Sequence, residues 1–136
     1  MDICITPKKL SGSMTPPPSK SMAHRAVLAM MLAGEDGTIS NLNDSQDVLA
    51  TRRCVAALKA AEPGQLPLLD CGESGSTLRF LIPIALAVAG GGQFTGQGRL
   101  MERPLQPYFD IFEEKGISYI LENGVLTIRG QLPPGI

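Results

Sequence analysis

The chain has 136 residues, which is enough for one hydrophobic core of ordinary size. It carries 12 Lys and Arg against 13 Asp and Glu, and this near balance excludes a general basic surface for nucleic acid. Any anion site must therefore be local. The three cysteines form no C-x-x-C pair and His24 is the single histidine. We therefore expect free thiols in a reducing cytoplasm and no metal site.

The first part of the chain predicts a short strand, an irregular segment and a helix. Residues 3–6 alternate weakly in hydrophobicity, as a strand does, whereas the Gly, Ser and Pro residues of 11–18 indicate a hinge or linker. Residues 19–21 open a run of good helix formers. Gly34 ends that run as a glycine typically ends a helix.

The middle of the chain predicts strand and helix in alternation. Residues 37–42 predict a short strand, and the polar residues 43–45 would cap a helix over 46–61. A second strand is predicted over 66–70. A tight glycine turn over 72–76 follows it.

A third helix is predicted over 77–89, with a kink at Pro83. Its apolar run falls far short of the roughly 20 residues that cross a bilayer, so we expect a buried helix and no membrane span. Residues 93–96 predict a strand and 104–115 a fourth helix. A hairpin turned by residues 122–124 joins strands over 117–121 and 125–129. These elements predict an α/β or α+β fold with helices on one side of a sheet.

Three segments have residues suited to binding an anion. The first is the helix start that contains Lys20, Ser21 and Arg25, where backbone N–H groups, the helix dipole and an ammonium all favour a phosphate or carboxylate. Ser21 and Arg25 are four residues apart and so share a helix face. The alternative interpretation is a capping serine with solvated basic residues.

The second segment runs from Asp70 to Phe80. Gly75 would let a ligand approach the backbone, with Ser76 beside it and Arg79 one helical turn further on. The spacing fits neither a nucleotide phosphate loop nor a G-x-S-x-G nucleophile turn. The alternative is a plain capped helix after a tight turn.

The third segment holds Arg99 and Arg103, four residues apart, and ends on Pro104, which would open a helix. Surface arginines are usually only solvated, so this segment alone carries little information. Three anion-suited segments in one nearly neutral chain are more informative together. Together they predict an anion-binding site.

The three segments, in this order and spacing, resemble the motifs of 5-enolpyruvylshikimate-3-phosphate (EPSP) synthases. The likeness extends from about Ile3 to the end of the chain. It implies transfer of the enolpyruvyl group of phosphoenolpyruvate to the 5-hydroxyl of shikimate 3-phosphate, in the route to aromatic amino acids. No metal or organic cofactor is implied. A monomeric cytoplasmic transferase is expected.

The resemblance also implies a fold of two lobes built from βαβαββ units, the inside-out α/β barrel of the enolpyruvyl transferases. Residues 1–12 would give the first strand of one lobe and the hinge. Residues 13–136 would form the first part of the substrate-binding lobe, and the remainder of the family's sequence is missing. The isolated chain is therefore expected to be inactive, since no catalytic acid–base pair lies within it.

By motif position, the resemblance implies that Lys20, Ser21 and Arg25 bind shikimate 3-phosphate. Lys20, Gly75 and Arg103 would bind phosphoenolpyruvate. The supporting residues would be Arg79, Ser76 and Arg99.

Two positions depart from the commonest family pattern. Glu73 replaces a neutral amide, which leaves the role of that position open, and Pro18 replaces a frequent glycine.

Two other functions are considered. One is a UDP-N-acetylglucosamine enolpyruvyl transferase, which usually has Lys-Asn where this chain has Lys20-Ser21. The other is a non-catalytic anion-binding module.

Overall fold

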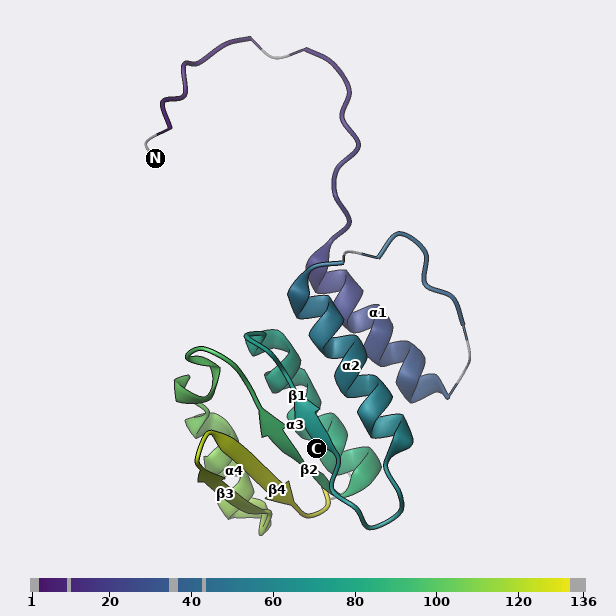
Figure 1. The fold of residues 1–136 in the computed structure, drawn as a ribbon, viewed down its shortest axis with the longest axis vertical. Coiled ribbons are helices and arrows are strands. Elements are labelled where there is room, and N and C mark those ends of the chain that lie inside the picture. The colour runs from purple at the N-terminus through teal and green to yellow at the C-terminus, as the bar shows by residue number, and fades with distance from the viewer. Residues whose placement is uncertain (1–2, 10, 35–36, 43, 133–136) are drawn as a thin grey trace.

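The structure is a computed structural model, and it describes residues 3–9, 11–34, 37–42 and 44–132. Its elements are drawn in Figure 1. In chain order they are the helices and strands α1 (Lys20–Ala33), α2 (Gln46–Ala60), β1 (Leu68–Asp70), α3 (Gly75–Ala89), β2 (Gly91–Thr95), the 3-10 helix η1 (Leu100–Glu102), α4 (Gln106–Lys115), β3 (Ser118–Glu122) and β4 (Val125–Arg129). The elements from β1 to β4 follow the order βαβαββ, as the sequence predicts.

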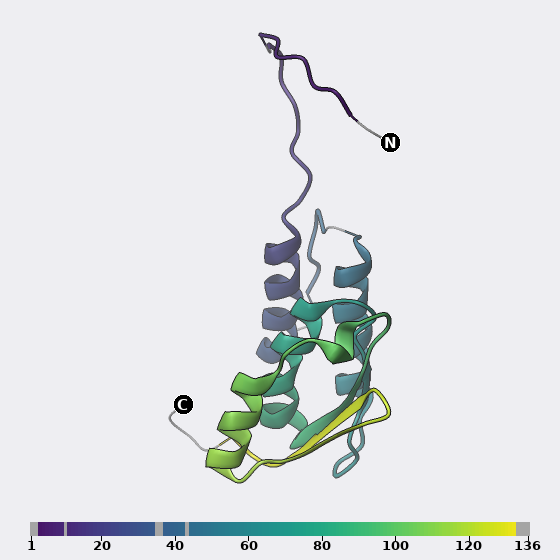
Figure 2. The same ribbon diagram turned by 90° about the vertical axis from the view of Figure 1, so that its left-hand side faces the viewer.

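The sheet has four strands in the order β1-β2-β4-β3, and only the β1–β2 pair is parallel. Leu69, Phe94 and Leu126 lie opposite one another in register and are fully buried. On the other face Leu68 and Ile120 remain more than half exposed. Helices therefore cover one face only, and Figure 2 shows α3 and α4 along that side. The predicted one-sided α/β arrangement is confirmed.

Helix α1 begins and ends as the sequence predicts. The Ser19 hydroxyl caps its start by accepting a hydrogen bond of 3.3 Å from the Met22 N–H. Gly34 ends it in the left-handed conformation, with φ of 68°. Helices α1, α2 and α3 lie beside one another and begin at the same end of the molecule (Figures 1 and 2). The positive ends of three helix dipoles therefore point the same way.

Helix α3 continues through Pro83 as one helix. A proline has no N–H, so the carbonyl of Arg79, four residues earlier, loses its helical partner. The Tyr108 hydroxyl of α4 donates a hydrogen bond of 3.0 Å to that carbonyl. Burial raises the pKa of Tyr108, against the opposing effect of the Arg79 charge. A side chain from α4 thus satisfies the backbone group that the proline leaves open.

The hairpin forms where the Asn-Gly turn predicts it. Asn123 and Gly124 have φ of 52° and 74°, as the two central residues of a type I′ turn require. The strands β3 and β4 pair from Glu122↔Val125 to Ser118↔Arg129. Local turn chemistry is sufficient to fix this register.

Two predicted strands do not form. Residues 3–6 and 37–42 are irregular in the structure, and Asn43 of the predicted cap lies outside the described residues. A strand needs a neighbour for its backbone hydrogen bonds. No described strand runs beside either segment. Residues 3–9 extend away from the helices in Figure 1, and residues 37–39 and 42 line a hollow together with residues of α1 and α2. The lobe boundary expected near residue 12 stays a prediction.

The other sequence expectations concern cysteines and membranes. All three cysteines are free thiols, with Cys4 exposed and the other two buried. Within the described ranges, none of the helices is long and apolar enough to cross a bilayer.

Candidate anion-binding site

The centre of the candidate site is the first turn of α3. Gly75 begins this helix, and a methyl group placed on its Cα would lie 2.6 Å from Arg103 Nη1 and 2.9 Å from Arg79 Nη1. Both guanidinium groups therefore converge on the glycine. Arg79 also donates a hydrogen bond of 3.4 Å from Nη1 to the Gly75 carbonyl. We name Gly75, Arg79 and Arg103 the Gly75 cluster.

The sheet topology explains why Arg103 reaches a glycine so distant in the sequence. Strands β1 and β2 are parallel, so the loops that follow them leave the same edge of the sheet. The Gln97 N–H donates to the Gly72 carbonyl at 2.7 Å, and the Cys71 N–H donates to the Thr95 carbonyl at 2.9 Å. These bonds hold the second and third motifs side by side.

The Gly75 cluster combines two positive charges without a counter-ion. Within the described ranges, neither Arg79 nor Arg103 forms an ion pair. Two guanidinium groups beside a helix start repel each other, and a bound anion would relieve that repulsion. A phosphate or carboxylate can accept bidentate hydrogen bonds from such groups.

The first motif lies on the neighbouring helix. Lys20 places its Nζ 2.7 Å from Asp47 Oδ2 in the first turn of α2. Ser21 and Arg25 are exposed on α1. Arg25 and Arg79 line the same hollow, of about 430 Å³, so the structure brings the first motif next to the second.

The remaining predicted residues lie at the rim. Ser76 is exposed in the first turn of α3. Arg99 is bound to Glu102 by an ion pair of 2.9 Å from Nε to Oε2, and it shares a hollow with Arg103. Glu73 turns its carboxylate toward Gly98, with Oε1 3.0 Å from where a methyl group there would lie.

Sequence reasoning missed a buried polar chain behind the site. His24 Nδ1 lies 2.7 Å from Thr51 Oγ1, which lies 2.8 Å from Thr77 Oγ1, which in turn donates to Ser74 Oγ at 2.7 Å. Burial lowers the pKa of His24; the Asp47 charge opposes this effect and the Lys20 charge adds to it. The four residues come from three separate motifs or helices, so no linear pattern could have linked them.

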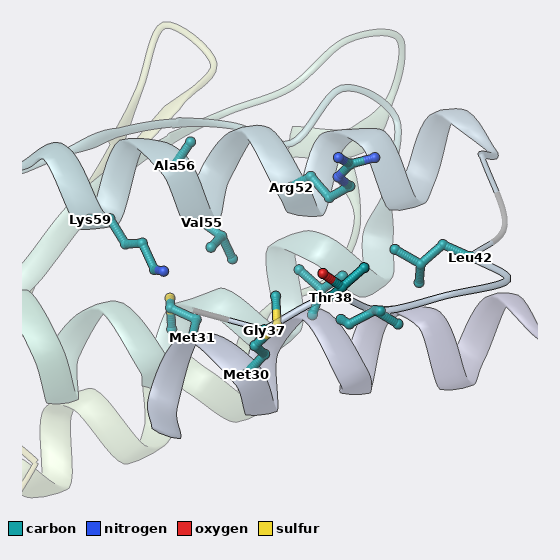
Figure 3. A pocket seen from close by; sticks show the side chains of 11 residues that line it. Met30, Met31, Gly37, Thr38, Leu42, Arg52, Val55, Ala56 and Lys59 are labelled. Atoms are coloured by element: carbon teal, nitrogen blue, oxygen red, sulfur yellow. The ribbon is translucent and has the colours of Figure 1, made fainter. Parts of the chain in front are cut away.

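A third hollow lies away from the site. It occupies about 370 Å³ between α1 and α2, under the segment of residues 37–42 (Figure 3). Its labelled lining includes Met30, Met31 and Val55, with Arg52 and Lys59 at α2. None of the sequence-predicted site residues lines it.

No metal site accompanies these residues. In the part of the chain that the structure describes, no group of three or more His, Cys, Asp or Glu side chains is arranged to hold a metal ion. The candidate site therefore consists of cations, backbone N–H groups and hydroxyls. These groups bind and orient anions.

Comparison with solved structures defines the class of protein. The chain superposes on EPSP synthase from Acinetobacter baumannii with a TM-score of 0.66, over 88% of this chain and 32% of that one, at 21% identity. The fold is that of the enolpyruvyl transferases, and the predicted fold class is confirmed.

Sequence comparison defines the family. Residues 5–132 match the family model for EPSP synthase (3-phosphoshikimate 1-carboxyvinyltransferase). The chain belongs to the EPSP synthase family. It is 42% identical to the 3-phosphoshikimate 1-carboxyvinyltransferase of Clostridium perfringens strain SM101 over 98% of its length, and 40% identical to that of Clostridioides difficile strain 630 over 96%. In both cases the chain spans 36% of the relative's length.

Proposed function

We propose that this chain supplies the anion-binding part of an EPSP synthase active site. The reaction transfers the enolpyruvyl group of phosphoenolpyruvate to the 5-hydroxyl of shikimate 3-phosphate and releases phosphate. The observation that carries the proposal is the Gly75 cluster, where two arginines that have no carboxylate partner among the described residues meet at a helix start. Family membership supports the choice of substrates.

The residues divide into two groups by position. Gly75 and Arg103 bind phosphoenolpyruvate, with Arg79 beside them, because these groups form one cationic surface. Ser21 and Arg25 bind shikimate 3-phosphate from the exposed side of α1. Lys20, at the start of the same helix, contacts both substrates once its ammonium leaves Asp47.

The contribution of these residues is to hold charge in a fixed geometry. Both substrates are anions that repel each other, and fixed cations reduce this repulsion while orienting the reacting carbon and hydroxyl. The reaction also needs a proton moved to the methylene carbon. His24, the only histidine, is buried between helices and does not reach substrate. The proton must come from a group outside this set of residues. A cytoplasmic location and a monomeric state remain part of the proposal.

A titration followed by nuclear magnetic resonance tests the proposal. Adding phosphoenolpyruvate to the ¹⁵N-labelled chain should shift the amide signals of Gly75 and Ser76, and adding shikimate 3-phosphate should shift those of Lys20 and Ser21. Arg103→Ala should weaken phosphoenolpyruvate binding by roughly 10- to 100-fold, since a hydrogen bond to a charged group contributes about 1.5–3 kcal/mol.

The matched control is Arg129→Ala, which removes an exposed arginine from β4. It should leave both affinities unchanged. Equal weakening of both substrates by Arg103→Ala would contradict the assignment of Arg103 to phosphoenolpyruvate. Absence of any shift with either substrate in the unmodified chain would favour the non-catalytic module or a different ligand.

A further inference from the structure

The inference concerns the buried polar chain formed by the side chains of His24, Thr51, Thr77 and Ser74, which we name the relay. These four are the buried polar or charged side chains among the described residues. They form one continuous series of contacts of 2.7–2.8 Å across α1, α2 and the start of α3. Such a series is costly to bury unless every member is bonded, so its geometry is tightly constrained.

The unpartnered nitrogen of His24 decides which atom donates in each hydrogen bond of the relay. His24 Nε2 is buried and has no partner among the described residues. A buried N–H without an acceptor costs more than a bare ring nitrogen, so the proton belongs on Nδ1. Nδ1 then donates to Thr51 Oγ1.

The distances indicate which acceptor each of the two threonine hydroxyl protons is donated to. Thr51 donates to Thr77 over 2.8 Å in preference to the Asp47 carbonyl at 3.3 Å. Thr77 donates to Ser74 Oγ over 2.7 Å in preference to the same carbonyl at 3.2 Å. Every bond of the relay thus runs from α1 toward Ser74.

The two ends of the relay lie beside the two halves of the candidate site. His24 is the residue before Arg25 on α1. Ser74 is the N-cap of α3, accepts a hydrogen bond from the Thr77 N–H at 3.2 Å, and directly precedes Gly75. A change in length of the relay would therefore move the Gly75 cluster relative to Arg25.

We propose that the relay positions the start of α3 against α1 and so sets the spacing between the two substrate-binding halves of the site. His24, Thr51 and Thr77 are positioning residues that touch no substrate. This inference rests on the proposed function, because it gives the relay its role in the anion site. The relay itself can be tested without any ligand.

The ligand-free test uses Thr51→Val, which removes one hydroxyl from α2 at nearly constant volume. The ¹⁵N signals of the His24 ring should show a proton on Nδ1 in the unmodified chain, and the variant should lose that preference. The amide signals of Ser21 on α1 and Gly75 on α3 should both shift, although neither helix is mutated. A proton on Nε2, or unchanged signals at both amides, would overturn the relay.

The ligand test uses Thr77→Val, with Thr127→Val on β4 as the matched control. In the 136-residue chain, Thr77→Val should weaken phosphoenolpyruvate binding roughly tenfold or more, because small misplacements of binding groups are costly. Thr77→Ser keeps the hydroxyl and should restore most of the affinity. Thr127→Val should bind normally.

The outcomes separate the two proposals. A folded Thr77→Val chain that binds phosphoenolpyruvate as tightly as the unmodified chain would overturn the positioning role and leave the proposed function intact. An unmodified chain that binds neither phosphoenolpyruvate nor shikimate 3-phosphate would overturn the proposed function, and the positioning role with it. Circular dichroism and urea unfolding of each variant show whether the fold is kept.

Discussion

At the scale of single residues, a substitution at Gly75 should weaken ligand binding without lowering the stability of the fold. An added methyl group would meet the ends of two flexible arginine side chains, at 2.6 Å and 2.9 Å, and the third-nearest atom belongs to one of the same side chains. The arginines can move, so we expect Gly75→Ala to fold with a free energy of unfolding equal to or up to about 1 kcal/mol above that of the unmodified chain. Phosphoenolpyruvate binding should weaken, because the methyl group occupies the place of the anion. Urea unfolding and calorimetric titration measure the two effects, and unchanged affinity would reduce Gly75 to a helix-start glycine.

Gly124→Ala provides the opposite control. Gly124 has φ of 74° in the hairpin turn, and a methyl group there would meet nothing within 4 Å. The cost is therefore conformational, and we expect about 1 kcal/mol of lost stability with unchanged phosphoenolpyruvate binding. If both Gly75→Ala and Gly124→Ala lowered phosphoenolpyruvate affinity and stability alike, crowding at the anion site could not be the reason for the loss of binding.

At the scale of elements, the contact between α3 and α4 depends on Pro83. The Tyr108 hydroxyl bonds to the Arg79 carbonyl because Pro83 supplies no N–H. We expect Tyr108→Phe to lower the free energy of unfolding by about 1 kcal/mol, since the carbonyl loses its partner. In a Pro83→Ala background the helix supplies its own N–H, and the same change should cost much less.

The double-mutant cycle of Tyr108→Phe and Pro83→Ala measures this coupling by urea unfolding. Tyr119→Phe is the control, because among the described residues its hydroxyl bonds only to the exposed Glu113 carboxylate, at 3.0 Å. It should cost less than about 0.5 kcal/mol. Additive effects of Tyr108→Phe and Pro83→Ala would show that the tyrosine does not replace the missing helical bond.

The free energy of unfolding should depend on pH through His24, which is buried where α1, α2 and α3 pack together. Burial lowers the pKa of His24 in the folded chain, with Asp47 opposing and Lys20 assisting, whereas the unfolded chain keeps a value near 6.5. Above that pH both states are neutral, and below it the unfolded state binds more protons. Stability should therefore fall as the pH decreases below about 6.5.

His24→Gln is the comparison for this pH effect. Carboxylates titrate in both proteins, so the difference in their unfolding free energies isolates the histidine. We expect that difference to shrink as the pH decreases from 7 to 5, measured by urea unfolding at each pH. A constant difference across this range would mean that His24 titrates alike in the folded and unfolded chains.

At the scale of the whole molecule, the residues of the site lie on one surface. The predicted site groups are cations and hydroxyls, and the single histidine, His24, is buried behind them. We expect the 136-residue chain to bind its anions without releasing phosphate from the substrate pair above background. Adding a polypeptide with the remaining two thirds of the Clostridium perfringens relative should restore turnover if the pieces associate. A phosphate-release assay measures whether the chain turns over the substrates, and robust activity of the chain alone would place the catalytic groups within it.

The sequence was most informative where structure and binding are local. The helix start at Ser19, the end at Gly34 and the Asn123-Gly124 turn follow from the preferences of a few adjacent residues. The three motifs were likewise readable, because each is a short run of basic residues and glycines. Family membership followed from their order and is confirmed by the comparisons.

The sequence failed where a partner far along the chain decides the outcome. Residues 3–6 and 37–42 have strand-like composition, yet they are irregular because no described strand offers them hydrogen bonds. The hydrogen bond from the Tyr108 hydroxyl to the carbonyl that Pro83 leaves open was likewise not predicted, because its partners lie 29 positions apart. The kink expected at Pro83 stays a prediction.

The sequence by itself therefore determined the family and the fold class, and it predicts which residues bind an anion, because each motif is a matter of local chemistry. Only the tertiary structure decided that Arg79 and Arg103 converge on Gly75, since two parallel strands bring their loops to one edge. It also decided that Lys20 pairs with Asp47 and that a buried relay joins α1 to α3. Contacts between residues about 25 to 30 positions apart depend on how the helices pack, and packing is not encoded in any short motif.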